Sequence, residues 1–139
     1  MRVLSVWQPW AWLVVHGYKD VENRTWRPNE PWSYPERIYI HAGKREDWTA
    51  WRGIREFYPD IWDLMCAPGQ VVVSGTWRKA LPYGAIVGEV EITDIVKNSP
   101  SRWAQLGYWH WILAKPVAYN VPIPCRGRPG LFEVKIDSP

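Results

Sequence analysis

The sequence predicts a single α+β domain, a small mixed β-barrel with helices at its periphery. Its length of 139 residues is typical of one domain. Segments with strand periodicity outnumber those with helical periodicity, and the helical segments fall in the connections between strands. Hydrophobic residues make up 47% of the chain, which is enough for one core and argues against disorder. We therefore expect residues 1–139 to fold as one unit.

The N-terminal part predicts a strand, a short helix and a second strand. Val3–Val6, apolar except for Ser5, is typical of a short buried strand. Pro9 suits the first turn of a helix, where its missing N–H costs nothing, and Gly17 is placed to end that helix. Lys19–Trp26 alternates in character, so every second side chain is expected on the same face of a strand.

Two helices are predicted in the middle of the chain, after a strand over Arg37–Ala42. Glu46–Tyr58 begins with acidic residues, which the helix dipole favours, and carries one apolar stripe. The stripe consists of Trp48, Trp51, Ile54 and Tyr58. Asp60–Met65 is a second, shorter candidate helix. Gly69–Pro82 is ambiguous, because its central valines fit either a strand or a long loop.

Three further strands are predicted in the C-terminal half. In Ala85–Val96, Ile86, Gly88, Val90 and Ile92 share one face, whereas Glu89 and Glu91 share the other. Tyr108–Leu113 and Leu131–Ile136 also have strand character. These strands complete the set from which the barrel would be built.

Charge and motifs restrict the kind of function. The formal net charge is +3, with 17 basic and 14 acidic residues, so an anionic partner is permitted but not required. The sequence has no motif typical of phosphate-binding loops, dinucleotide sites, serine hydrolases or zinc proteases. Its three histidines are scattered without metal-ligand spacing. We therefore expect neither a metal nor a cofactor.

The chain is expected to be soluble and cytoplasmic. The distant pair Cys66 and Cys125 makes no disulfide framework, which is typical of a reducing compartment. The apolar stretch Val3–Val15 is interrupted by polar residues and lacks the end of a signal peptide. No run reaches the roughly 18 apolar residues of a membrane span, so no membrane partner is expected. The sequence leaves the oligomeric state open.

The tryptophan content points to a binding protein. The chain contains 12 tryptophans, more than one core of this size can bury. Some indoles must therefore lie at the surface, in a groove or at an interface. An apolar stripe such as that of Trp48 and Trp51 is expected to belong to the core, and Trp7, before the first helix, is expected to be buried.

The segment from Gly17 to Trp26 concentrates charge after the first helix. Glu22 and Arg24 are expected on the same strand face, close enough to pair. An arginine fork binds a carboxylate bidentately or a phosphate, and Lys19 beside the turn is a second phosphate ligand or a base. The alternative from spacing alone is a surface ion pair on an edge strand.

These residues carry a resemblance to a known family. The start Gln8-Pro9-Trp10-Ala11 and the pattern G-x-K-x-x-E-x-R resemble the ASCH domain, a relative of the PUA-like β-barrels. The pattern stands here as Gly17, Lys19, Glu22 and Arg24. Further similar segments follow in the expected order: residues 38–42, 86–90, 108–113 and 126–132. The stretch from Lys44 to Pro82 is the least similar.

The resemblance implies a fold and a function. It implies a small barrel with a cleft between the first helix and the sheet, lined by the motif residues. It implies binding of RNA, another nucleic acid or a nucleotide. Domains of this kind also occur in transcription coactivators, which leaves a protein-interaction module with exposed indoles as a further hypothesis.

A branch of the superfamily supplies an enzymatic alternative. That branch hydrolyses acylated cytidine with a lysine followed three positions later by threonine, and a distant glutamate. Lys19 matches the lysine, but Glu22 occupies the threonine position, so the hydroxyl nucleophile is missing. Thr25 is expected on the opposite strand face. A Lys19–Glu22 pair remains able to transfer protons to a bound nucleoside or RNA.

Two sets of candidate site residues follow. The nucleic-acid-binding set is Gln8, Trp10, Trp12, Lys19, Arg24, Arg126 and Arg128. The catalytic set for the hydrolase alternative is Lys19, Glu22 and Glu89. One of the two helical indoles is expected to face the cleft and stack on a base. Each candidate also has an ordinary structural interpretation: helix capping for Gln8, core packing for the indoles, a solvated turn for the arginines and an outward charge for Glu89.

Overall fold

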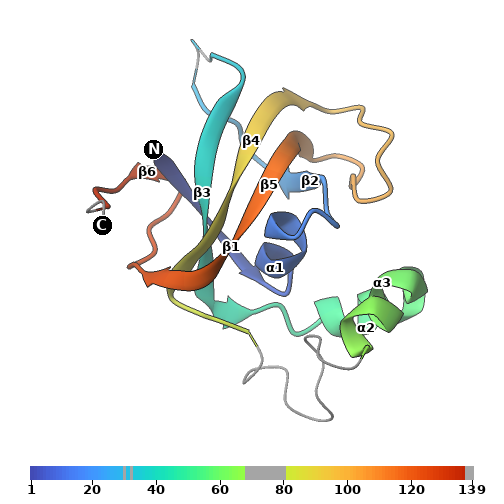
Figure 1. Cartoon of the computed structure of the whole chain (residues 1–139). Helices are drawn as coiled ribbons and strands as arrows, with labels where there is room; N and C mark the ends of the chain where they lie inside the picture. Colours follow the sequence, from blue (N-terminus) through green and yellow to red (C-terminus); the bar gives the residue numbers. More distant parts are fainter. Residues whose placement is uncertain (30, 32, 68–80, 137–139) are drawn as a thin grey trace.

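A computed structural model describes residues 1–29, 31, 33–67 and 81–136 of the chain. Within these ranges the elements follow in the order β1-α1-β2-β3-α2-α3-β4-β5-β6 (Figure 1). The strands are β1 (Arg2–Gln8), β2 (Val21–Arg24), β3 (Glu36–Glu46), β4 (Ala85–Val96), β5 (Trp109–Pro124) and β6 (Leu131–Glu133). The helices are α1 (Trp10–Val15), α2 (Ala50–Phe57) and α3 (Pro59–Cys66). The predicted α+β class is confirmed.

The described strands form one mixed sheet in the order β2-β5-β4-β3-β1-β6. β1 pairs with β3 in parallel, and the other pairs are antiparallel. The prediction of a closed barrel is wrong, because β2 and β6 are edges that do not pair with each other. β2 has only four residues, which are all paired with β5, and the sheet continues through β1 to the short β6 rather than returning to β2.

The side chain of Arg24 crosses the gap between β2 and β1, which no backbone pairing closes. Arg24 on β2 donates from Nη2 to the carbonyl oxygen of Ser5 on β1 at 2.7 Å. The sheet is therefore curved enough for its β2 edge to approach β1, although these strands do not pair. We call this gap, between Ser5 and Arg24, the seam.

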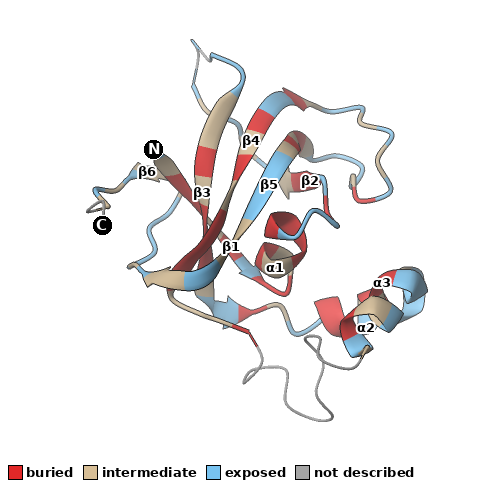
Figure 2. Ribbon diagram, viewed as in Figure 1, coloured by how far each residue is buried: buried red, intermediate tan, exposed pale blue. Residues whose placement is uncertain are grey.

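Helix α1 packs against the inner face of the curved sheet (Figure 1). Its Ala11, Val14 and Val15 belong to the main core with apolar residues of β1, β3, β4 and β5. Buried residues concentrate on α1 and on the strand segments around it (Figure 2). Gly17 ends the helix as predicted, with φ +82° and its N–H donating to the Val14 carbonyl.

Helices α2 and α3 build a second, smaller core beside the first. Trp51, Ile54, Ile61 and Met65 pack there with Leu13 of α1 and Trp103. The two helices lie to one side of the sheet (Figure 1). The short helix predicted over Asp60–Met65 is confirmed as α3.

The helix predicted from Glu46 begins later, at Ala50. Glu46 is instead the last residue of β3, opposite Gln8, and its carboxylate accepts hydrogen bonds from Trp51 and Tyr83. Trp48 consequently precedes the helix and is 79% exposed, so its predicted place in the core is wrong. A strand pairing thus overrode a local helical pattern.

Other expectations about the chain are corrected in smaller ways. Trp7, expected to be buried, is 49% exposed. β5 extends from Trp109 to Pro124, well beyond the predicted Leu113, while β6 ends at Glu133. The ambiguous segment Gly69–Pro82 lies outside the described residues except for its last two positions.

Candidate functional site

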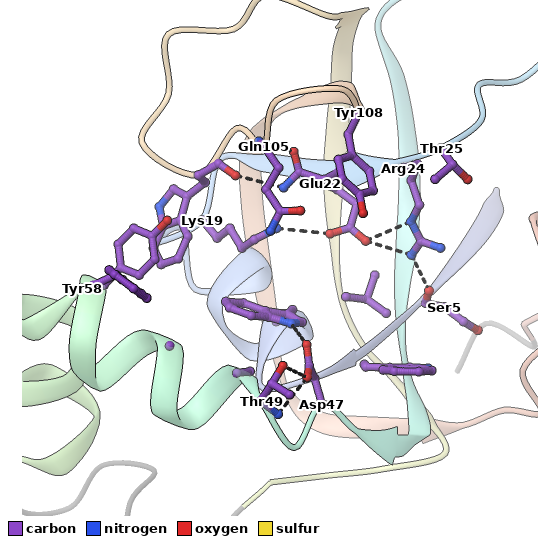
Figure 3. A pocket seen from close by; sticks show the side chains of 18 of the residues that line it. Ser5, Lys19, Glu22, Arg24, Thr25, Asp47, Thr49, Tyr58, Gln105 and Tyr108 are labelled. Carbon is purple, nitrogen blue, oxygen red and sulfur yellow. Dashed lines mark hydrogen bonds and ion pairs between the residues drawn. The ribbon is translucent and has the colours of Figure 1, made fainter.

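A cavity of about 620 Å³ lies along the seam (Figure 3). It is walled by β1, the start of α1, the segment through β2, the β3–α2 connection, α2 and the chain around Trp103. The residues used below are Ser5, Trp10, Lys19, Glu22, Asn23, Arg24, Asp47, Tyr58, Trp103, Gln105 and Tyr108. We call this cavity the cleft. A volume of this size is typical of small-molecule sites.

The charged motif forms a single bridged group at the back of the cleft. Glu22 Oε1 lies 3.2 Å from Lys19 Nζ, and Glu22 Oε2 lies 2.8 Å from Arg24 Nη2. Arg24 also donates from Nε to the same Oε2 at 3.0 Å. Figure 3 shows Glu22 between the two cations. The i, i+2 spacing on β2 places Glu22 and Arg24 on one face, as the sequence predicts.

Burial makes this bridge unlike a surface ion pair. Lys19 is 6% exposed and Glu22 is 7% exposed. Burial alone raises the pKa of the Glu22 carboxyl, but the charges and hydrogen bonds of Lys19 and Arg24 outweigh it and leave that pKa below its ordinary value. Glu22 is therefore a carboxylate at neutral pH, and the alternative of a solvent-exposed pair on an edge strand is wrong.

Both cations also bind backbone carbonyl groups. Lys19 Nζ donates to the Val21 carbonyl at 2.5 Å, and Arg24 donates to Ser5 across the seam. Lys19 Nζ lies 5.5 Å from the centre of the Trp10 ring, within cation–π range. The chain itself thus holds both cations in place through its own carboxylate and carbonyl groups.

Aromatic rings form the walls of the cleft. Trp10 donates from Nε1 to Asp47 Oδ2 at 2.9 Å, which fixes the indole plane, and it meets Trp103 edge-on at 6.2 Å. Tyr58 stacks on Trp103 at 4.2 Å. Tyr108, at the rim, is 37% exposed. These rings offer stacking faces for a flat ligand.

Polar groups complete the lining. The side chain of Asn23 donates to the Trp103 carbonyl and accepts from the Gln105 N–H, which ties β2 to the segment that carries Gln105. The Gln105 side chain is exposed at the cleft. Lys19 and Arg24 are balanced by Glu22 and Asp47, so the described lining carries no net charge.

The side chain of Asp47 is held by hydrogen bonds within the turn before α2. Its Oδ1 accepts from the backbone N–H and the hydroxyl of Thr49, at 3.0 and 2.8 Å. Burial raises the pKa of Asp47, but the hydrogen bonds from Trp10 and Thr49 prevail and leave the pKa below its ordinary value. A carboxylate at this turn therefore fixes the orientation of Trp10.

The structure brings four predicted site residues together: Trp10, Lys19, Glu22 and Arg24. It does not bring Gln8 or Trp12 to the cleft. Gln8 is fully buried, accepting from the Trp12 N–H at 2.9 Å and donating to the Pro82 carbonyl at 3.1 Å. Trp12 stacks on His16 and Tyr18 outside the cleft.

The remaining predicted residues lie elsewhere. Glu89 lies 3.3 Å from Arg37 Nε in an ion pair and does not line the cleft, so its interpretation as an outward charge fits better than a catalytic one. Arg126 and Arg128 are exposed. Arg126 lines a second cavity, described below, and Arg128 lines neither of the two cavities.

Sequence reasoning missed four other residues of the cleft. Asn23 lies on β2 between Glu22 and Arg24, whereas Asp47, Gln105 and Tyr108 come from connections between elements. The pattern Asp47-x-Thr49 before a helix was a usable signal for a capping turn, but nothing local linked Gln105 to β2.

The described part of the chain gives no sign of a metal centre or a spanning helix. No group of three or more metal-ligating side chains occurs within residues 1–29, 31, 33–67 and 81–136. No helix among these residues is long and apolar enough to cross a membrane.

Comparison with known proteins gives one family. The family model described as the ASCH domain matches residues 4–122. The match includes most of β1 and β5, all of β2, β3 and β4, and every residue of the cleft named above. No curated protein matches the sequence.

Proposed function

The chain belongs to the ASCH domain family, a PUA-like family whose members generally bind RNA, and from this premise we propose that it binds single-stranded RNA by accepting an unpaired base in the cleft. Trp10 and Tyr108 supply the stacking faces. Gln105 and the carboxylate of Glu22 are the groups that would hydrogen-bond to the base edge.

The balance of charge in the cleft is the observation that carries this proposal. Lys19 and Arg24 are already bound to Glu22 and to backbone carbonyls, so neither is a free ligand for phosphate. A neutral, aromatic-walled cavity of about 620 Å³ suits an uncharged base better than a run of phosphates. In this proposal Lys19 and Arg24 hold Glu22 in position, Glu22 hydrogen-bonds to the base, and the phosphates are bound outside the cleft.

Exposed cations beside the cleft supply the phosphate contacts. Arg27 and Lys97 lie 4.5 and 4.6 Å from the centre of the Trp109 ring. Trp109 is the cross-strand partner of Arg24 and follows Tyr108 of the cleft rim in the chain. We call Arg27, Lys97 and Trp109 the rim patch. An RNA strand leaving the cleft past Tyr108 would meet it.

Titration of a labelled single-stranded RNA, followed by fluorescence anisotropy, tests the proposal. Tyr108→Ala is expected to weaken binding about 5- to 150-fold, because stacking contributes about 1–3 kcal/mol per base. Tyr18→Ala is the matched control, since Tyr18 is 39% exposed but lies outside the cleft. Equal losses in the two variants, or no loss in either, would contradict base binding in the cleft.

The hydrolase alternative rests on the contact between Lys19 and Glu22. Incubation of the protein with single-stranded RNA and with an acylated cytidine separates it from binding alone. Product that disappears in Lys19→Met supports turnover. Binding without product supports the module proposed here, and partner capture that is insensitive to Lys19→Met supports the protein-interaction alternative.

A further inference from the structure

A second cavity, of about 280 Å³, shares Ser5 with the cleft and is otherwise lined by different residues. These are His41, Gly43, Lys44, Gly84, Cys125, Arg126 and Gly127. Figure 3 shows how Ser5 serves both sides: its carbonyl oxygen accepts from Arg24, while its side chain extends away from Arg24. The proposed RNA-binding function uses none of the other residues of this cavity.

Ser5 and His41 are neighbours across the parallel β1–β3 pair. Ser5 Oγ lies 2.8 Å from His41 Nδ1, and His41 Nε2 lies 2.7 Å from the Cys125 carbonyl oxygen. A carbonyl only accepts, so Nε2 carries the hydrogen and Nδ1 of the neutral ring presents its lone pair to the serine hydroxyl. The Ser5 hydroxyl therefore donates to a ring nitrogen whose tautomer is fixed.

The environment keeps His41 in the form of a base. The residue is 2% exposed, and burial lowers the pKa of His41 below its ordinary value, although the hydrogen bond to Cys125 acts in the opposite direction. The imidazole is therefore neutral at physiological pH. A serine, a base bonded to it, and a third group that orients the base are the parts of an activated nucleophile.

Gly127 lets the chain pass directly against this pair. A Cβ at position 127 would lie 2.8 Å from His41 Cε1 and 3.1 Å from Ser5 Oγ. No larger residue fits there without displacing the imidazole or the hydroxyl. The contact holds the ring in place while Ser5 and His41 still line the cavity.

Two cations define the charge of the cavity. Lys44 and Arg126 line it and are exposed at residue level. Within the described residues neither has an ion-pair partner. A carboxylate or phosphate on a substrate, and the oxyanion that forms on a carbonyl under attack, would both be stabilised there.

We propose that Ser5 and His41 are the nucleophile and base of a second site, which hydrolyses small esters that carry a negative charge. Ser5 Oγ attacks the acyl carbon, its proton moves to His41 Nδ1, and the bond from that carbon to the alcohol oxygen breaks as the alcohol takes the proton. Water then attacks the acyl-serine, His41 takes a proton from the water, and Ser5 recovers it. The products are a carboxylic acid and an alcohol.

A short alkyl fluorophosphonate tests the nucleophile on the intact protein. Attack by Ser5 forms an Oγ–P bond, expels fluoride and transfers the serine proton to His41. We expect one adduct per chain, mapped by mass spectrometry to Ser5 and absent in Ser5→Ala. Ser33→Ala is the control, because Ser33 is an exposed serine outside both cavities. A folded wild-type protein without an adduct at Ser5 would overturn the proposal.

Two further variants test the base. His41→Gln is expected to slow labelling at least about 100-fold, since a positioned general base contributes about 10²–10⁴-fold. Gly127→Ala keeps the imidazole but places a Cβ against His41 Cε1 that displaces the ring, so it is expected to slow labelling as well. Circular dichroism identifies variants that fold. Labelling at the wild-type rate in a folded variant of either kind contradicts the assigned pair.

The charge preference has its own test. Hydrolysis of 4-nitrophenyl succinate, which bears a carboxylate, is compared with that of 4-nitrophenyl acetate, each corrected for the rate without protein. We expect at least a tenfold preference for the succinate, and its loss when Lys44 and Arg126 are both replaced by alanine. Equal wild-type rates on the two esters would overturn the assignment of an anionic substrate.

Discussion

At the scale of single residues, Glu22 joins the two cations at the back of the cleft. One buried carboxylate holds Lys19 on one oxygen and Arg24 on the other. Removing one member of such a group is more damaging than its net contribution suggests, because the partners stay buried and unpaired. The same carboxylate therefore determines both the stability of the seam and the shape of the site.

Replacing Glu22 by glutamine tests this role directly. Glu22→Gln leaves Lys19 and Arg24 without a counter-charge, and it is expected to lower the free energy of unfolding by about 3–5 kcal/mol at neutral pH. Urea unfolding followed by tryptophan fluorescence measures the difference. A change below about 1 kcal/mol would mean that the two cations find other partners.

The pKa of Glu22 also predicts a pH dependence. Its folded-state pKa lies below the ordinary value of about 4.5, so the unfolded chain binds the proton more readily than the native one. The stability due to Glu22 is complete above about pH 4.5 and is lost as the pH falls through the folded-state pKa. Unfolding at pH 7, 5, 4 and 3 should show a steeper acid loss in the wild type than in Glu22→Gln. If the stability of the wild type and of Glu22→Gln fell equally with pH, the lowered pKa of Glu22 would be contradicted.

At the scale of elements, the close approach of α1 to β4 positions the cleft. Gly88 on β4 makes this approach possible, because a Cβ there would lie 2.8 Å from Val15 Cβ and would also collide with the Val117 carbonyl. α1 begins at Trp10 and is followed by Lys19. The position in which α1 packs on the sheet therefore determines where both residues lie. A residue in the core of the sheet thus controls the geometry of the site.

Gly88→Ala is expected to destabilise the protein by about 1–3 kcal/mol, the usual cost of overpacking. Gly53→Ala is the control, because nothing lies within 4 Å of a Cβ at that helical position and alanine favours a helix by up to about 1 kcal/mol. Thermal unfolding of the two variants should shift in opposite directions. A Gly88→Ala protein as stable as the wild type would show that α1 can move away from β4.

At the scale of the whole molecule, the exposed positive charges of the rim patch lie outside the cleft. The chain has a net charge of +3, yet the described cleft lining is balanced and its cations are already paired. The exposed cations of the rim patch lie outside the cleft. Affinity through phosphates and selection of a base are therefore expected to come from different surfaces.

Salt dependence tests that separation. If Arg27 and Lys97 each neutralise one RNA phosphate, the replacement of either by alanine should reduce the slope of log K against log salt by about 0.7. Lys135→Ala is the control, since Lys135 follows β6 at the far edge of the sheet from β2. Slopes unchanged in Arg27→Ala and Lys97→Ala would place the phosphates elsewhere.

Much of the fold follows from local pattern. The alternation over Ala85–Val96 predicts β4 with its observed bounds, and Gly17 predicts the end of α1. Glu46 and Trp48 show where local pattern fails: a pairing with Gln8 extends β3 to Glu46, the first position of the predicted helix, and the helix itself begins only at Ala50, after Trp48. Long-range hydrogen bonds of this kind have no signature within a short window of sequence.

The sequence by itself determined the family and the α+β class, and it set Glu22 and Arg24 on one strand face, because residues spaced two apart on a strand must share a face. Glu22 therefore lies beside Arg24 on β2. Only the tertiary structure decided that the sheet stays open, that Arg24 spans the seam to Ser5, and that Trp10 rather than Trp12 faces the cleft. Those outcomes depend on sheet curvature and on contacts between residues far apart in the chain, such as Trp10 with Asp47 and Ser5 with His41.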